Sequence, residues 1–296
     1  MKQFSQLILF IFISLLFHAC QFNQTDQKII SVTIEPQRYF AEKIAGDKFT
    51  IHSVVPAGQS PETYDPAPRE MVNIGKSTAY FRIGYIGFEE VWMPAIVENN
   101  PQLKVFDMSE GIELIRNLNP HTHHHDHEGD LHHHHHHSGV DPHSWSSITG
   151  AKMIAWNMLN AFIALDPEHT KYYWNNYGRL MYEIEETEKT IGTMFKGLQE
   201  RTFIIYHPAL TYLAHEYRLN QLCIERDEKE PSPAQLKELI EEAREYKARV
   251  VFVQQEFDRK NAELIARETS CRLVSINPLD YNWSQEMIRI ATALTE

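Results

Sequence analysis

The sequence predicts an α/β protein of two lobes, each with a central, mainly parallel β-sheet flanked by helices. Two observations predict this fold. Short apolar segments alternate with helical segments in both halves of the 296-residue chain, which is the pattern of βαβ units. Between the halves lies one amphipathic stretch of about 30 residues, which we expect to form a rigid spine helix joining the lobes.

Residues 1–20 have the pattern of a secretion signal. The apolar run at residues 7–17 is too short to cross a bilayer but suits a signal peptide. The run ends at a small residue followed by Cys20, which resembles a bacterial lipoprotein signal in which that cysteine is lipidated. Phe17 and His18 are bulky for this motif, so an ordinary cleaved signal is the alternative. We expect an exported protein, periplasmic or on the cell surface, anchored to the membrane by lipid on Cys20.

Charge and cysteine content narrow the possible partners. The formal net charge of −12 makes nucleic acid an improbable partner and cations a favoured one. After Cys20 only Cys223 and Cys271 remain, and we expect intervening strands to keep them from pairing. We expect no later segment to be long and apolar enough to span a membrane, and we expect a monomer.

The first lobe is expected at residues 28–165, after a short polar tether at 21–27. Its apolar, strand-like segments are separated by turn residues and by two helical segments. The expected strands are residues 29–34, 49–55, 78–83 and 103–107, and the expected helices are 36–46 and 88–98.

The spine helix is expected at residues 166–199. Asp166 can cap it and Pro167 suits its first position, while no further proline occurs before Pro208. Apolar residues recur with the helical period and form one face of the expected helix. They are Tyr173, Tyr177, Leu180, Ile184, Ile191, Phe195 and Leu198. A helix of this length would be roughly 45 Å long, the height of a whole domain.

The second lobe, residues 200–296, repeats the alternation of the first. Ser232, Pro233 and Gln235 form the sequence signature of a capping box at the start of a helix. The expected strands are residues 203–206, 221–224, 250–253 and 272–276, and further helices are expected at 209–217 and 260–269.

A histidine-rich segment at residues 119–138 separates the first lobe's strands from the spine. So many imidazoles cannot share a hydrophobic core, so we expect a solvated loop that binds transition metals weakly. An expression tag is the alternative, but the run lies in the middle of the chain. The expected accessory ligands are His121, His123, His124, His125, His127, His132, His133, His134, His135, His136 and His137.

Specific metal ligands are expected from segments that directly follow predicted strands or lie in a major loop between elements. Ligands of open parallel sheets bind at the carboxyl ends of the strands. Two facing lobes would bring Glu62 and His143 from one side to His207 and a C-terminal residue from the other. Imidazoles combined with carboxylates are a natural zinc set. A single histidine after a strand is more often structural, and we expect His52, His169 and His215 to be surface residues.

Several motifs occur in a fixed order along the chain. They are Ile44-Ala45-Gly46-Asp47, Val54-Val55-Pro56-Ala57-Gly58, Tyr64-Asp65-Pro66, Met108-Ser109-Glu110-Gly111-Ile112, Asp141-Pro142-His143-Ser144-Trp145, Glu230-Pro231-Ser232-Pro233 and Val253-Gln254-Gln255-Glu256-Phe257. As a series they resemble the zinc ABC-transporter solute-binding proteins, the ZnuA-like members of the metal-binding cluster A-I family with the TroA-like fold. The resemblance covers essentially the whole mature chain. It implies a metal in the cleft between the lobes and little movement about the spine.

The resemblance places His143 and His207 on two family ligands. Histidine at the second position resembles the zinc branch, because the manganese branch tends to have a carboxylate there. Two positions depart from the family pattern. Glu62 stands where histidine is usual, and Asn277 stands where aspartate is frequent. Asp280 could replace that aspartate, and water or a loop histidine could also complete the site.

The resulting hypothesis is a zinc-binding component of an ABC transporter that delivers zinc ion to a permease in the inner membrane, and not an enzyme. The loop would collect zinc beside the tight site. A manganese- or iron-binding member of the same family is the alternative, and a zinc-dependent hydrolase is a more distant one. The chain has no His-Glu-x-x-His, Gly-x-Ser-x-Gly or phosphate-loop motif for a hydrolase. A metal buffer acting through the loop alone would not need two lobes.

Overall fold

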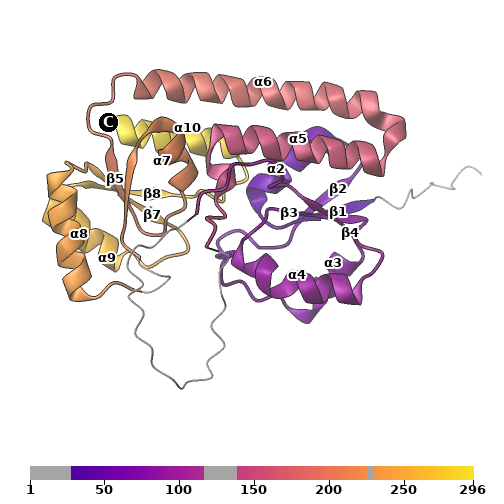
Figure 1. The fold of residues 1–296 in the computed structure, drawn as a ribbon, viewed down its shortest axis with the longest axis horizontal. Helices are drawn as coiled ribbons and strands as arrows, with labels where there is room; N and C mark the ends of the chain where they lie inside the picture. The colour runs from indigo at the N-terminus through magenta and orange to yellow at the C-terminus, as the bar shows by residue number, and fades with distance from the viewer. Residues whose placement is uncertain (1–27, 117–138, 226–229) are drawn as a thin grey trace, which may run out of the picture.

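A computed structural model describes residues 28–116, 139–225 and 230–296. Two lobes lie side by side beneath one long helix (Figure 1). The expected signal peptide, Cys20, the tether and all eleven accessory histidines lie outside the described residues.

The first lobe contains a four-stranded parallel sheet in the order β2-β1-β3-β4. Its central strands β1 and β3 are mostly buried, as is typical of parallel sheets covered by helices. One face packs against α2 and, further along the chain, α5 (Ile148–Leu165), while α3 and α4 cover the other (Figure 1). The bounds are β1 Ile29–Val32, α2 Glu35–Ala45, β2 Thr50–Ser53, α3 Pro68–Gly75, β3 Ala79–Arg82, α4 Gly87–Asn99 and β4 Lys104–Asp107.

The second lobe repeats this design with a parallel sheet in the order β6-β5-β7-β8. The predicted capping box is present, with the backbone amide of Gln235 donating to the hydroxyl of Ser232 at the start of α8. Helices α8 and α9 cover one face of the sheet. The bounds are β5 Thr202–Ile205, α7 Thr211–Tyr217, β6 Asn220–Cys223, α8 Pro233–Glu245, β7 Val250–Gln254, α9 Lys260–Thr269, β8 Arg272–Ile276 and α10 Trp283–Thr295.

The spine helix is confirmed as α6, Thr170–Phe195, which runs across both lobes (Figure 1). With 26 residues it is roughly 39 Å long. It begins later than predicted because Pro167–His169 forms a separate 3₁₀ turn. Asp166 does not cap α6, which has no side-chain cap hydrogen bond. Its carboxylate instead accepts a hydrogen bond from the Tyr173 hydroxyl at 2.6 Å. The buried side of α6 contains five of the predicted apolar residues, Tyr173, Leu180, Ile184, Ile191 and Phe195.

Helices α3, α5 and α10 were not predicted from the sequence. Helix α5, Ile148–Leu165, is the one described helix long and apolar enough to span a membrane by length and composition, so the expectation of none was wrong. In this structure it is a core helix packed between α2 and α6, with half of its residues buried. The burial of Ile154, Met158 and Phe162 against the first sheet and the spine accounts for its apolar composition.

The main hydrophobic core is continuous through both lobes. At its centre two buried tryptophans, one from each lobe, donate hydrogen bonds to backbone carbonyls of the other lobe. The Trp145 indole N–H donates to the carbonyl of Pro278 at 2.9 Å, and the Trp283 indole N–H donates to the carbonyl of Trp145 at 2.7 Å. Because both indoles are about 1% exposed, these bonds join the lobes in a dry interior.

The two remaining cysteines are on well-separated parts of the second sheet. Cys223 ends β6 and Cys271 precedes β8, with β5 and β7 between those strands. No disulfide joins them, as the sequence analysis expected.

Candidate metal centre

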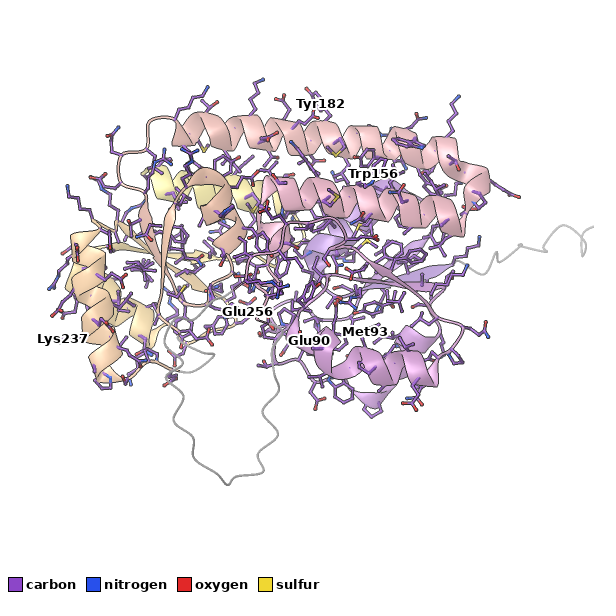
Figure 2. All side chains as sticks on the ribbon, in the orientation of Figure 1. Glu90, Met93, Trp156, Tyr182, Lys237 and Glu256 are labelled. Atoms are coloured by element: carbon purple, nitrogen blue, oxygen red, sulfur yellow. The ribbon has the colours of Figure 1, made fainter. Side chains whose placement is uncertain are left out.

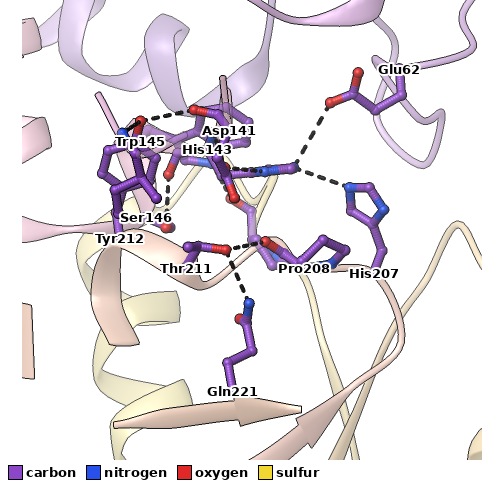
Figure 3. A network of polar contacts seen from close by, with 12 residues as sticks. Glu62, Asp141, His143, Trp145, Ser146, His207, Pro208, Thr211, Tyr212 and Gln221 are labelled. Carbon is purple, nitrogen blue, oxygen red and sulfur yellow. Dashed lines mark hydrogen bonds and ion pairs between the residues drawn. The ribbon is translucent and has the colours of Figure 1, made fainter. Parts of the chain in front are cut away.

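Three side chains from separate loops meet between the lobes (Figure 3). Glu62 follows β2, His143 precedes α5, and His207 lies two residues after the end of β5. One ligand atom from each lies within 4.8 Å of the others, and the three form the only such group of potential metal ligands in the part of the chain that the structure describes. These are the three residues that the sequence analysis expected to converge.

Glu62 presents one bound and one unbound oxygen. Its Oε2 accepts a hydrogen bond from the backbone N–H of Gly87 at 2.9 Å, at the N-terminus of α4. That helix end favours a negative charge. Its Oε1 is buried without a hydrogen-bond partner among the described residues and lies 3.9 Å from Nε2 of His143. A buried, unsatisfied carboxylate oxygen beside an imidazole is suited to a cation.

Gly87 makes this approach possible. A Cβ atom built on it would lie 2.3 Å from the backbone oxygen of Glu62. The next residue, Phe88, donates its backbone N–H to the carbonyl of Pro61 at 2.9 Å. The first turn of α4 is therefore pressed against the backbone of the ligand loop.

His143 is buried and fixed by Asp141. The Asp141 Oδ1 lies 2.9 Å from Nδ1 of His143 and also accepts the backbone N–H of His143 at 2.9 Å. The carboxylate thus favours the proton on Nδ1 and leaves Nε2 as the ligand atom. Burial opposes protonation of His143, but Asp141, and beyond it Glu62 and Glu225, outweigh burial and raise the pKa of His143 above its usual value.

His207 has the same arrangement on the second lobe. Its Nδ1 lies 2.7 Å from Oε2 of Glu225, so its Nε2 also faces the site. The side chain of Gln254 pairs with the backbone of His207, donating to its carbonyl at 2.7 Å. The ring of Phe257 stacks on the His207 ring at 5.3 Å and 18°.

The distances match a tetrahedral ion. Two nitrogens each about 2.0–2.1 Å from a tetrahedral zinc would be about 3.3–3.4 Å apart. The Nε2 atoms of His143 and His207 are 3.2 Å apart. The Glu62 Oε1 lies 3.9 Å from Nε2 of His143, about 0.5 Å longer than the separation of two donors across such an ion, and all three ligand atoms lie within 4.8 Å of one another.

The structure does not bring Asp280 to this group. Its Oδ1 accepts the backbone N–H of Asn282 at 2.8 Å, and its Oδ2 lies 3.3 Å from the side-chain amide of Asn277. Neither Asp280 nor Asn277 lines the cleft that contains the three ligands. The carboxylate of Asp280 instead stabilises the turn between β8 and α10.

The cleft contains a carboxylate that the sequence analysis did not select. The walls include Pro61, Glu62 and His143 from the first lobe and His207, Glu256 and Phe257 from the second. Glu256 belongs to a segment that carried the family resemblance, two residues after the end of β7. Its position after a strand was the available signal.

The other histidines in the described ranges lie elsewhere. His52 and His215 are exposed, and His169 is partly exposed and bonded to Asp166 at 2.8 Å. These three are surface residues, as expected.

The model of the zinc-uptake complex component A family, described as periplasmic, matches residues 30–295. The chain belongs to the ZnuA family. A crystal structure of ZnuA superposes with a TM-score of 0.81 at 31% identity, covering 91% of this chain and 98% of that one. The high-affinity zinc uptake system protein ZnuA of Bacillus subtilis is 28% identical over 262 residues, which are 87% of this chain and 80% of that protein. Members of the family are metal-binding components of ABC transporters, with a permease as partner.

Relatives of this ZnuA family member are named for different metals. A manganese ABC transporter substrate-binding lipoprotein of Streptococcus anginosus is 24% identical over 239 residues, 77% of this chain and 72% of that protein. An iron ABC transporter substrate-binding lipoprotein of Streptococcus pyogenes is 26% identical over 242 residues, 78% and 73% of the two chains. Family membership therefore establishes metal binding, and the choice of metal depends on the ligands of this site.

Proposed function

We propose that this chain captures zinc outside the cytoplasm and delivers it to the membrane permease of an ABC transporter. The observation that carries the proposal is the pair of imidazole Nε2 atoms 3.2 Å apart, each backed by a carboxylate at Nδ1. The unpartnered Oε1 of Glu62 faces the same point. The zinc-uptake relative in Bacillus subtilis supports this choice of metal.

The donor set favours zinc over manganese. Two neutral imidazoles suit zinc, whereas manganese favours sites dominated by carboxylate, carbonyl and water oxygens. Glu62 in place of a histidine adds one hard oxygen and reduces this preference without reversing it. Iron(II) is weaker than zinc for such a site in the general order of divalent affinities.

The remaining expectations are part of the same proposal. We propose that residues 1–20 direct export, that lipid on Cys20 anchors the mature chain, and that the protein acts as a monomer and not as an enzyme. Relatives named as lipoproteins support the anchor. We also propose the division into a first lobe at 28–165, a spine at 166–199 and a second lobe at 200–296. The histidines of residues 119–138 would act as weaker, accessory zinc ligands beside the cleft.

Calorimetric titration of zinc into the protein, with and without residues 119–138, tests the proposal. The deletion should remove weak binding and leave one tight site. Loss of the tight site with the loop would refute the assignment to the cleft. In the shortened protein, His207→Ala should abolish tight binding, and manganese should bind more weakly than zinc. Tighter binding of manganese would assign the protein to the manganese branch instead.

A further inference from the structure

The three ligands described above leave one position of a tetrahedral ion open. A solute-binding site must hold zinc tightly, and closed zinc sites have four ligands. Asp141 and Glu225 are engaged at the Nδ1 atoms of the two histidines, and Asp280 lies outside the cleft. Among the described residues that line the cleft, the only carboxylates are Glu62 and Glu256, one from each lobe.

Glu256 is held in a fixed relation to His207. Strands β5 and β7 are parallel neighbours, so the residues that follow them meet at one edge of the sheet. Gln254, at the end of β7, pairs with the backbone of His207, and Phe257 stacks on its ring. Glu256 lies between these two contacts in the sequence. The backbone that carries Glu256 is therefore held beside His207.

The Glu256 carboxylate has an unsatisfied atom in the cleft. Its Oε1 is buried and accepts no hydrogen bond from the described residues, as is also true of Oε1 of Glu62. Figure 2 places Glu256 in the middle of the molecule, between the lobes. An unsatisfied buried oxygen is costly and indicates an absent partner. Two glutamates and two neutral imidazoles would give a bound zinc ion no net charge in its first shell, which reduces the cost of burying it.

We propose that Glu256 is the fourth zinc ligand of the cleft, on the same lobe as His207. Its carboxylate lines the cleft outside the group that Glu62, His143 and His207 form in the metal-free structure, so it would move toward them when zinc binds. This inference rests on the proposed function and adds a residue to its site. The site would then have two nitrogen and two oxygen donors, with one glutamate and one histidine from each lobe. Glu256 would take the place that Asp280 was expected to fill.

Competition of the full chain against a chromophoric zinc chelator tests the assignment, because weak sites on the histidine-rich segment do not compete with a strong chelator. Glu256→Gln should lower the affinity of the tight site by on the order of 100-fold or more, since even the loss of a partner outside the first shell costs 10–100-fold. The matched control is Asp280→Asn, which should change the affinity less than threefold. Thermal melting of both metal-free variants should resemble that of the unchanged protein, because each substitution keeps the side-chain shape.

A second readout separates a ligand from a residue that only shapes the cleft. Cobalt(II) in the tight site should give the intense visible bands of four-coordinate cobalt, and Glu256→Gln should change their position and intensity, whereas Asp280→Asn should not. Unchanged affinity and an unchanged spectrum in Glu256→Gln would overturn the inference while leaving the proposed function intact. A loss of zinc affinity and a changed cobalt spectrum in Asp280→Asn, with neither in Glu256→Gln, would also overturn the inference. Absence of tight zinc binding in the unchanged protein would refute the proposed function and this inference together.

Discussion

Substitution of Gly87 by alanine should damage the metal site from the first turn of α4. The new Cβ would lie 2.3 Å from the carbonyl oxygen of Glu62 and 3.1 Å from its Cα, both of them backbone atoms. An ordinary contact needs about 1 Å more than the shorter distance. The hydrogen bond from Gly87 to Oε2 of Glu62, now 2.9 Å, would then stretch beyond the range of a hydrogen bond.

The magnitude follows from that bond. A hydrogen bond to a charged group contributes about 1.5–3 kcal/mol. If that stabilisation of the ligand geometry is lost, zinc affinity should fall by about 10- to 100-fold. The displacement of about 1 Å also exceeds the tolerance of about 0.2 Å for metal–ligand distances. Chelator competition with zinc measures the change in affinity.

Gly192→Ala is the matched control. Gly192 lies inside α6, and a Cβ there would meet nothing within 4 Å. This variant should gain about 0.5–1 kcal/mol of stability from the better helix former and bind zinc normally. Gly87→Ala that remains folded and binds zinc with unchanged affinity would refute the argument, because it would show that Glu62 does not depend on the approach of α4.

Three further predictions concern the carboxylates. Asp141→Asn and Glu225→Gln should each weaken zinc binding by about 10–100-fold in chelator competition, because each removes the partner that orients a ligand imidazole; unchanged affinities would contradict that role. Zinc affinity should fall as the pH is lowered through the raised pKa of His143, where protons compete for Nε2, and Asp141→Asn should shift this fall to lower pH in titrations across pH 5–8. Burial raises the pKa of Glu89 to about 7 from about 4.5, so the stability linked to its protonation is present below about pH 4.5 and is lost as the pH rises through 7. The stability lost over this pH range is about 3 kcal/mol. In urea unfolding of the metal-free protein, Glu89→Gln should make the free energy of unfolding depend less on pH over this range. The same pH dependence in the variant and the unchanged protein would disprove the prediction.

Much of the fold could be predicted from the sequence because its strands are short apolar runs between clear turn signals. The capping box at Ser232 and the apolar face of α6 are local patterns, and both are present in the structure. Helix α5 was missed because a core helix with apolar residues on most sides lacks a clear period.

The candidate site was partly predictable for a different reason. Loops at the carboxyl ends of parallel strands converge wherever two such sheets face each other. Glu62 and His207 follow strands and His143 lies in the long connection before α5, so the three could be selected without knowing the strand order. Glu256 also follows a strand, but its proximity to His207 could not be predicted, because it depends on β5 and β7 being neighbours in the sheet. Asp280 was expected in the site, but hydrogen bonds within its own turn hold its carboxylate away, and side-chain partners of this kind cannot be read from spacing.

The hydrogen bonds from Trp145 to Pro278 and from Trp283 to Trp145 have a consequence for the release of the metal. A carrier whose lobes share one sealed interior cannot release its cargo by swinging wide open, since water would have to enter around both indoles. The permease would instead encounter nearly the same outline in the loaded and empty protein. Discrimination between the two states, and the step that frees the ion, would then depend on small displacements of the loops that carry Glu62 and Glu256.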